Sequence, residues 1–163
     1  MKKVLYLHGL ESDQGGPKVD YLSNKCCVHA PKIDYTRKDI FQFLTQTVEH
    51  LNPDLIIGSS MGGYSAFMLS NLYNIPIIAF NPALHSRSTD PKFPQNIVVE
   101  NMVLKNAKVI LGSKDEFIDP KITKKIIKDM TSNSTQSIKT EIVGGMGHRI
   151  PLDIFITKTQ HEF

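Results

Sequence analysis

The chain has 163 residues, which is the size of one domain, and we expect residues 1–163 to fold as a single unit. A net charge of +3 without an arginine-rich patch argues against a nucleic-acid-binding protein. No signal peptide is visible, and no apolar run approaches the ~20 residues of a membrane-spanning helix. We therefore expect a cytoplasmic protein that does not insert into a membrane.

Short apolar segments alternate with amphipathic segments along the chain. We expect strands at residues 3–9, 25–31, 54–59, 75–84, 107–113 and 138–145, and helices at residues 17–24, 36–51, 61–73 and 119–130 and after Pro151. This alternation predicts a three-layer α/β fold, in which helices cover both faces of a mostly parallel sheet. Residues 85–106 contain prolines and no strand pattern, so they are expected to form a short cap segment. The adjacent Cys26 and Cys27 suit neither a disulfide framework nor a zinc site, and we expect both to be buried, reduced thiols.

The segments that follow the predicted strands differ from the other connections in composition. They read "HGLES", "GSSMGG", "NPALH", "GSKDEF" and "GGMGH", and they are rich in Gly, Ser, Asp and His. In open α/β sheets, ligands bind beyond the carboxyl ends of the strands. The functional site is therefore expected among these loops.

One of these loops contains a candidate nucleophile. Residues 58–62, "GSSMG", fit the pattern G-x-S-x-G centred on Ser60, between a predicted strand and a predicted helix. A sharp strand-to-helix turn crowds the positions two residues before and after the serine, so both must be small. Ser60 has glycines there, whereas Ser59 would have Ile57 and Met61. Ser60 is therefore the expected nucleophile, provided that a base and an acid lie in the right loops.

The base and the acid are sought in the loops after the later strands. His148 follows the last strand and is the preferred base, although His85, which follows the strand adjacent to the serine turn, is a serious alternative. Asp119 precedes Pro120 and is explained as a helix N-cap. Asp115 has no such local role and is the preferred acid, with Glu116 as the alternative. The order Ser60, Asp115, His148 is the chain order of the α/β-hydrolase triad.

Two backbone N–H groups are candidates for an oxyanion hole. The N–H of Met61 lies at the positive end of the helix that follows Ser60. The N–H of Leu10 lies in the loop after the first strand, where Gly9 allows a close approach of the backbone. These two donors are expected to hold the oxygen on which charge develops.

The motifs "YLHGLES", "IIGSSMGGYSA", "AFNPAL", "LGSKDE" and "GGMGHRI" together resemble the small bacterial esterases of the YqiA type, within the α/β-hydrolase superfamily. The resemblance runs from Lys2 to about Phe155. It implies six parallel strands in the order 2-1-3-4-5-6. It also implies the roles given above for Ser60, Asp115, His148, Leu10 and Met61. We further place four residues at the substrate-binding site: His8, Gly9, Asn81 and His85.

The expected activity is hydrolysis of a small carboxylic ester or thioester through an acyl-enzyme, without a metal or an organic cofactor. The short cap predicts an open site for small or flexible acyl groups. Two alternatives keep the same fold. One is a non-catalytic binding protein, in which Ser60 is only a turn residue. The other is an acyltransferase that uses the same triad with an acceptor other than water.

Overall fold

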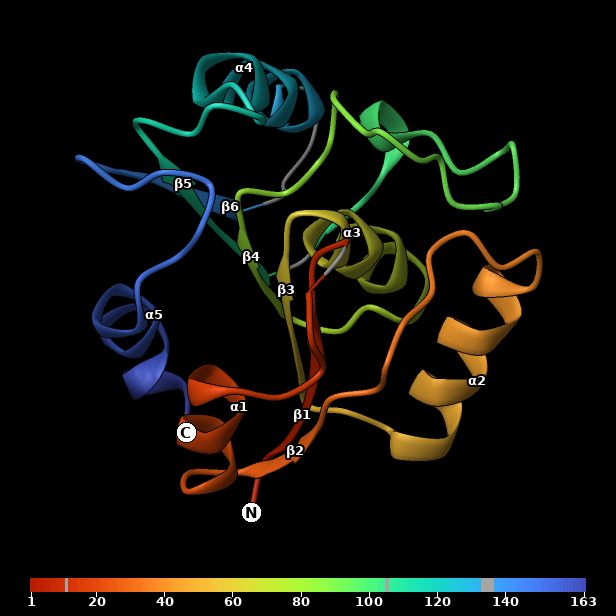
Figure 1. Ribbon diagram of the computed structural model, residues 1–163. Helices are drawn as coiled ribbons and strands as arrows, with labels where there is room; N and C mark the ends of the chain where they lie inside the picture. Colours follow the sequence, from red (N-terminus) through yellow and green to blue (C-terminus); the bar gives the residue numbers. More distant parts are fainter. Residues whose placement is uncertain (11, 105, 133–136) are drawn as a thin grey trace.

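The computed structural model describes all residues except 11, 105 and 133–136 (Figure 1). The strands are β1 (Lys3–Leu7), β2 (Cys27–His29), β3 (Leu55–Ser59), β4 (Ile77–Phe80), β5 (Asn106–Gly112) and β6 (Ser137–Val143). The α-helices are α1 (Pro17–Ser23), α2 (Ile40–Leu51), α3 (Met61–Tyr73), α4 (Pro120–Thr131) and α5 (Leu152–Thr159). Short 3-10 helices occur at η1 (Val99–Asn101) and η2 (Gln160–Glu162).

The strands of the described residues form one sheet in the order β2-β1-β3-β4-β5-β6, and every neighbouring pair is parallel. This confirms the strand order that the family resemblance implies. Because all strands run the same way, the loops that follow them emerge at one edge of the sheet. The sheet therefore gathers the candidate functional loops at a single end of the molecule.

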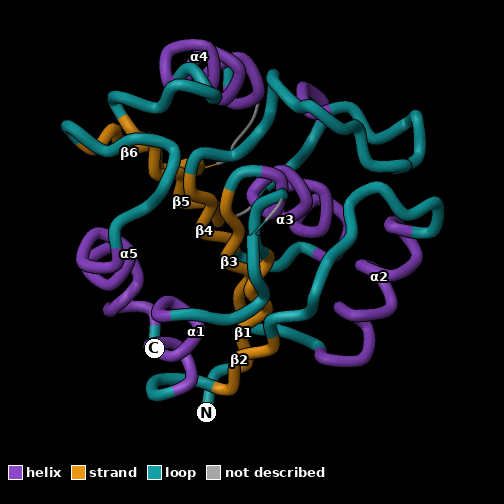
Figure 2. The backbone as a smooth tube through the Cα atoms, viewed as in Figure 1, coloured by secondary structure: helices purple, strands orange, loops and turns teal. Residues whose placement is uncertain are grey.

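Helices cover both faces of this sheet (Figure 2). Helices α2, α3 and α4 pack on one face, and α1 and α5 pack on the other. Side chains of β1 alternate between the two cores: Leu5 and Leu7 enter the first, and Val4 and Tyr6 enter the second. Helix α3 is buried along its first ten residues, from Met61 to Ser70, and is the most deeply enclosed helix. The element that starts at the candidate serine is thus held on a rigid, central support.

Residues 85–104 of the cap segment contain no strand, as predicted, and η1 is their regular element; the last residue assigned to the segment, Asn106, already begins β5. The expectation for the cysteines is right for Cys26, which is buried, and wrong for Cys27, which is exposed. Strand β2 lies at the sheet edge, pairs only with β1 among the described strands and begins at Cys27, so this side chain is left uncovered. Of the described helices, none is both long and apolar enough to cross a bilayer.

Candidate active site

Ser60 forms the turn between β3 and α3 in a strained backbone conformation, with φ 54° and ψ −114°. A non-glycine residue rarely adopts a positive φ, and surrounding contacts must enforce it. The Ser60 N–H donates to the Phe80 carbonyl at 2.9 Å. The Ser60 carbonyl accepts from the N–H groups of Tyr64 and Ala83, both at 3.0 Å. The start of α3 and the end of β4 thus fix the turn that exposes the hydroxyl.

The glycines on both sides of Ser60 allow the backbone to pack this tightly. A Cβ atom on Gly58 would lie 2.3 Å from the Gly62 carbonyl oxygen. A Cβ atom on Gly62 would lie 2.0 Å from the Leu7 carbonyl oxygen. Both distances are far below van der Waals contact, so neither position accepts a side chain without movement of the main chain. This is the steric requirement that the G-x-S-x-G spacing predicts.

The three side chains of the candidate triad form a continuous hydrogen-bonded chain. His148 Nε2 lies 3.1 Å from Ser60 Oγ, and His148 Nδ1 lies 2.8 Å from Asp115 Oδ2. The carboxylate can only accept, so Nδ1 carries the proton that it donates to Asp115. In the neutral imidazole, Nε2 is then unprotonated and accepts the hydrogen of the Ser60 hydroxyl. The arrangement has the geometry of a nucleophile, a base and an orienting acid.

The Asp115 side chain is completely buried, with an exposed fraction of 0%, whereas the His148 side chain keeps 22% exposed. Asp115 Oδ1 also accepts hydrogen bonds from the backbone N–H groups of Phe117 at 2.9 Å and Ile118 at 2.8 Å. These bonds fix the carboxylate plane and thereby orient the imidazole. The neighbouring Asp119 accepts from the N–H groups of Lys121 and Ile122, as an N-cap of α4 does.

The loop after β1 carries Leu10 to the wall of the same cleft as Ser60 and Met61. His8 is buried at the end of β1 and does not line this cleft. Its Nδ1 donates to the Gly9 carbonyl at 2.7 Å, and its Nε2 accepts the Ile33 N–H at 3.0 Å. In a trans peptide, the carbonyl and the N–H point in opposite directions. The Gly9 carbonyl also accepts the Ser12 N–H at 3.3 Å, and His8, through the shorter bond, helps to fix the direction of the Leu10 N–H.

The other two predicted substrate-binding side chains are also placed away from the cleft wall. Asn81 is buried, donates to the carbonyls of Gly147 and His148 and accepts the Gly112 N–H at 2.7 Å. It therefore ties the loop that carries His148 to the ends of β4 and β5. His85 lines a neighbouring hollow, where its Nε2 lies 3.3 Å from the Asp119 carbonyl oxygen. Of the four residues predicted to bind substrate, Gly9 is the one that the structure places at the cleft.

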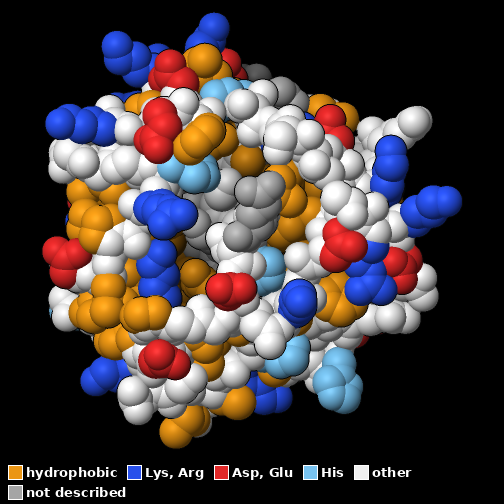
Figure 3. All heavy atoms as spheres, in the orientation of Figure 1, with side chains coloured by type: hydrophobic (Ala, Val, Ile, Leu, Met, Phe, Trp, Pro, Cys, Tyr) orange, Lys and Arg blue, Asp and Glu red, His pale blue; other side chains and the backbone are white. Residues whose placement is uncertain are grey.

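The cleft around Ser60 and His148 has a volume of about 940 Å³. Its wall includes apolar side chains on several loops and at the start of α3, namely Leu10, Met61, Phe117, Ile118 and Ile150. It also includes the basic side chains Lys18, Arg87 and Arg149. Figure 3 shows a hollow near the middle of this face, with basic and apolar side chains at its rim. An apolar wall with a few polar groups suits a small organic ligand.

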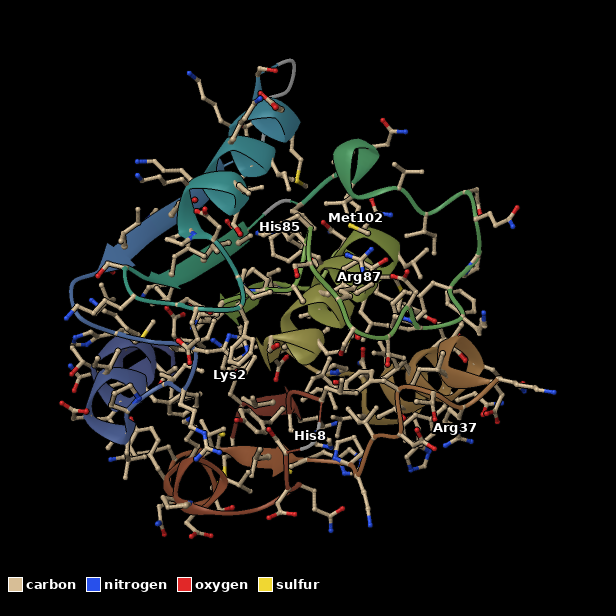
Figure 4. All side chains as sticks on the ribbon, turned by 45° about the horizontal axis from the view of Figure 1, so that its top comes forward. Lys2, His8, Arg37, His85, Arg87 and Met102 are labelled. Carbon is tan, nitrogen blue, oxygen red and sulfur yellow. The ribbon has the colours of Figure 1, made fainter. Side chains whose placement is uncertain are left out.

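The cap segment is anchored beside this cleft through Arg87 and Phe93. Arg87 donates to the carbonyls of Ala83 and Leu84, pairs with Asp90 at 2.8 Å and stacks 4.3 Å above the Tyr64 ring. Phe93 packs against Tyr64 as well, with 5.5 Å between the ring centroids. Figure 4 shows Arg87 and His85 on the segment that passes over α3. The segment forms one rim of the cleft and leaves the site open.

Several residues at this cleft escaped the sequence reasoning. Phe117 is 64% exposed, and its ring packs edge-on against His148 with 5.1 Å between centroids. The sequence gives one indication of this position, because Phe117 lies only two residues after the predicted acid Asp115. Lys18 and Arg149 gave no signal, because a lone basic residue in a loop or at a helix start is normally a solvated surface group. Within the described residues, no group of three or more His, Cys, Asp or Glu side chains could hold a metal ion.

The comparisons with known proteins agree with this architecture. The sequence model of the family described as Uncharacterised protein family (UPF0227) matches residues 3–114. The chain belongs to this family. The match confirms the resemblance to the YqiA-type group that the motifs indicate. It contains Leu10, Ser60 and Met61, and it ends one residue before Asp115.

Solved structures show the same fold at low sequence identity. An α/β hydrolase from the metagenome of sediments of the Mar Chica lagoon in Morocco has a TM-score of 0.71 and 15% identity, and the match covers 99% of this chain and 89% of that one. A monoacylglycerol lipase of Paleococcus ferrophilus has a TM-score of 0.68 and 15% identity, with 91% and 86% covered. An α/β serine hydrolase without lid from Xanthomonas campestris has a TM-score of 0.59 and 14% identity, with 99% and 82% covered. The chain therefore has the α/β-hydrolase fold.

Proposed function

We propose that the protein is a serine hydrolase that cleaves a carboxylic ester or thioester through an acyl-enzyme. The observation that carries the proposal is the hydrogen-bonded chain from Ser60 Oγ through His148 to the buried Asp115 carboxylate. A turn residue or a binding site has no need of a strained serine, an oriented imidazole and a buried carboxylate together. The lipase and the serine hydrolase among the compared structures lend further support.

In the proposed reaction, Ser60 Oγ attacks the substrate carbonyl carbon while His148 Nε2 takes the hydroxyl proton. The Asp115 carboxylate stabilises the imidazolium that forms. As the tetrahedral intermediate collapses, His148 returns this proton to the leaving alcohol or thiol, and an acyl-serine remains. A water molecule then gives a proton to His148 and attacks the acyl-serine carbonyl. The acid leaves, and the proton passes back to Ser60 Oγ.

The oxyanion of both intermediates would be held by the N–H groups of Leu10 and Met61. The Met61 N–H belongs to the first turn of α3, whose N–H groups have no partner within the helix. The Leu10 N–H is used by no loop hydrogen bond among the described residues. Both donors are therefore free to bind an oxyanion. Removal of one such donor typically lowers kcat by about 10²- to 10³-fold.

The experiment that tests the proposal is intact-mass analysis after treatment with a fluorophosphonate. We expect one adduct on the wild type and none on Ser60→Ala. Ser59→Ala is the matched control, because it removes the adjacent hydroxyl and should keep the adduct. Hydrolysis of short p-nitrophenyl esters should disappear in Ser60→Ala alone.

Two other outcomes would change the conclusion. A folded wild type that forms no adduct and hydrolyses no ester would contradict the proposal and favour a binding protein. An adduct together with acyl transfer to added alcohols or amines in preference to water would favour an acyltransferase.

A further inference from the structure

Three basic side chains line the same cleft as Ser60 and His148 and are not used by the proposed mechanism. Arg87 is paired with Asp90, which leaves Lys18 and Arg149. Lys18 is the second residue of α1 and is half-buried, and Arg149 follows His148 directly in the loop after β6. We call Lys18 and Arg149 the basic pair. Figure 3 shows basic side chains next to one another at the rim of the hollow on this face.

Neither member of the basic pair has an acidic partner within the described part of the chain. The other two arginines do: Arg37 pairs with Asp39 at 2.6 Å and Arg87 with Asp90 at 2.8 Å. The Lys18 ammonium lies over the Phe155 ring, 5.9 Å from its centroid. The acidic side chains at the cleft, Asp13 and Glu116, are exposed and form no ion pair with the basic pair.

An unpaired charge at a partly buried position costs free energy, because it loses part of its hydration without gaining a counter-charge. Burial lowers the pKa of the Lys18 ammonium for this reason. An anionic ligand that reaches the cleft would restore the missing interaction. Arg149 is exposed, so the cost of burial falls on Lys18; Arg149 adds a planar fork of donors that suits carboxylate and phosphate oxygens.

We propose that the basic pair binds a carboxylate or phosphate group on the leaving part of the ester or thioester. The inference rests on the proposed function. The leaving part is favoured because Arg149 adjoins His148, which must reach the leaving oxygen or sulfur to return the proton. The apolar wall of the cleft remains available for the acyl group. The substrate class is therefore an acyl ester or thioester of an anionic alcohol or thiol.

The test compares esters that share an acyl group and differ only in the charge of the leaving part. We would measure kcat/KM for 3-(butyryloxy)benzoate, 3-(butyryloxy)phenyl phosphate and the neutral 3-(butyryloxy)benzamide. Each value is divided by the rate constant for base hydrolysis of that ester, which removes the difference in leaving-group reactivity. The variants are wild type and the double variant Lys18→Gln, Arg149→Gln. The matched control is Lys38→Gln, Lys124→Gln, which removes the same charge at exposed positions outside the cleft.

For the wild type we expect at least one anionic ester to be preferred by about tenfold, which is typical of charge-assisted hydrogen bonds. The anion that is preferred distinguishes a carboxylate from a phosphate substrate. The preference should shrink to within about twofold in the double variant, persist in the control and weaken with added salt. Equal normalised kcat/KM values for all three esters, or a preference that survives in the double variant, would overturn the inference. In that case, Ser60-dependent hydrolysis of the neutral ester would still support the proposed function. No hydrolysis of any ester would overturn both.

Discussion

Among single residues, Asp115 has the most demanding environment in the site. It is fully enclosed and accepts hydrogen bonds from two backbone N–H groups and from His148. The two backbone N–H donors belong to Phe117 and Ile118, which lie in the same loop as Asp115, just before α4. The carboxylate is therefore fixed by its own loop. This arrangement lets a short stretch of chain position the imidazole without a separate supporting element.

The variant Asp115→Asn tests this orienting role. The asparagine NH₂ group would face His148 Nδ1 and favour the tautomer that carries its proton on Nε2. That tautomer cannot accept the Ser60 hydroxyl hydrogen, so kcat should fall by about 10⁴-fold with little change in KM. The measurement is steady-state hydrolysis of a short ester, with the exposed Asp129→Asn on α4 as control. Retention of a tenth or more of the wild-type kcat would rule out the assigned role.

His8 acts at the same scale, as a positioning residue. We expect His8→Leu to lower kcat by about 10- to 100-fold with KM little changed, because the Gly9–Leu10 peptide loses the bond that orients the Leu10 N–H. It should also cost about 1–3 kcal/mol of stability, since the Ile33 N–H loses its acceptor.

His8→Asn keeps a side-chain donor for the Gly9 carbonyl and should recover most of the lost kcat. Stopped-flow or steady-state kinetics together with urea unfolding separate the two effects. Equal losses of kcat in both variants would reduce His8 to a packing role.

The residue-level predictions from the sequence differ in how local their reasons are. Ser60 could be predicted as the candidate nucleophile because its glycine neighbours reflect a steric rule that acts within five residues. Asp115 could be separated from Asp119 because an N-cap has a local signature. The roles of His8, Asn81 and His85 could not be predicted, because each depends on which way a side chain turns in the folded chain. The position of a residue in a loop at the end of a strand indicates that the residue lies near the site. It does not indicate whether the side chain points toward the site or away from it.

At the scale of elements, the turn from β3 to α3 is the part that tolerates least change. We expect Gly58→Ala to lower the free energy of unfolding by about 3 kcal/mol, because its Cβ would lie 2.3 Å from a carbonyl oxygen. Gly144→Ala is the control: a Cβ there meets nothing within 4 Å, and the change should stay within about 0.5 kcal/mol. Urea unfolding of both variants provides the comparison. Similar midpoints would show that the turn relaxes easily.

The positions of most strands and helices along the chain could be predicted, because the spacing of apolar residues indicates them. The alternation of apolar and amphipathic segments gave the strand and helix sequence, and the Asp119–Pro120 pair marked the start of α4. The pattern overestimated the lengths of two strands in particular: β2 covers residues 27–29 where 25–31 were expected, and β4 covers residues 77–80 where 75–84 were expected. Strand β2 lies at the sheet edge and pairs with β1 only over Cys27–His29, so the residues that flank it in the expected strand are left outside the sheet.

For the whole molecule, buried tyrosines link stability to alkaline pH. Burial raises the pKa of Tyr6 to about 12 and also raises the pKa of Tyr35. The folded state keeps both phenols protonated, whereas the same tyrosines in the unfolded chain ionise with a pKa near the ordinary value of about 10. The contribution of Tyr6 is therefore complete below pH 10 and is lost as the pH rises toward 12, and the contribution of Tyr35 also begins to be lost above pH 10.

We expect the free energy of unfolding to fall above pH 10 by up to about 1.4 kcal/mol per pH unit for each such tyrosine. Tyr6→Phe should make this decline shallower while leaving stability at pH 7 nearly unchanged. Urea unfolding at pH 9, 10 and 11 measures the slope. An identical slope in wild type and variant would show that Tyr6 does not contribute.

The way in which the cap segment is attached has a consequence for protein engineering. The segment is pinned at its start by Arg87 and in its middle by Phe93, and residues 95 and 96 between Phe93 and η1 are exposed. Exposed loop positions of this kind accept inserted chain more readily than packed ones. A graft at residues 95–96 would therefore lengthen the cap segment, while the candidate triad and the two candidate oxyanion donors stay in the loops after β1, β5 and β6 and in the turn from β3 to α3. The chain is thus a compact scaffold, in which the cap segment can be replaced without changing the residues of the candidate active site.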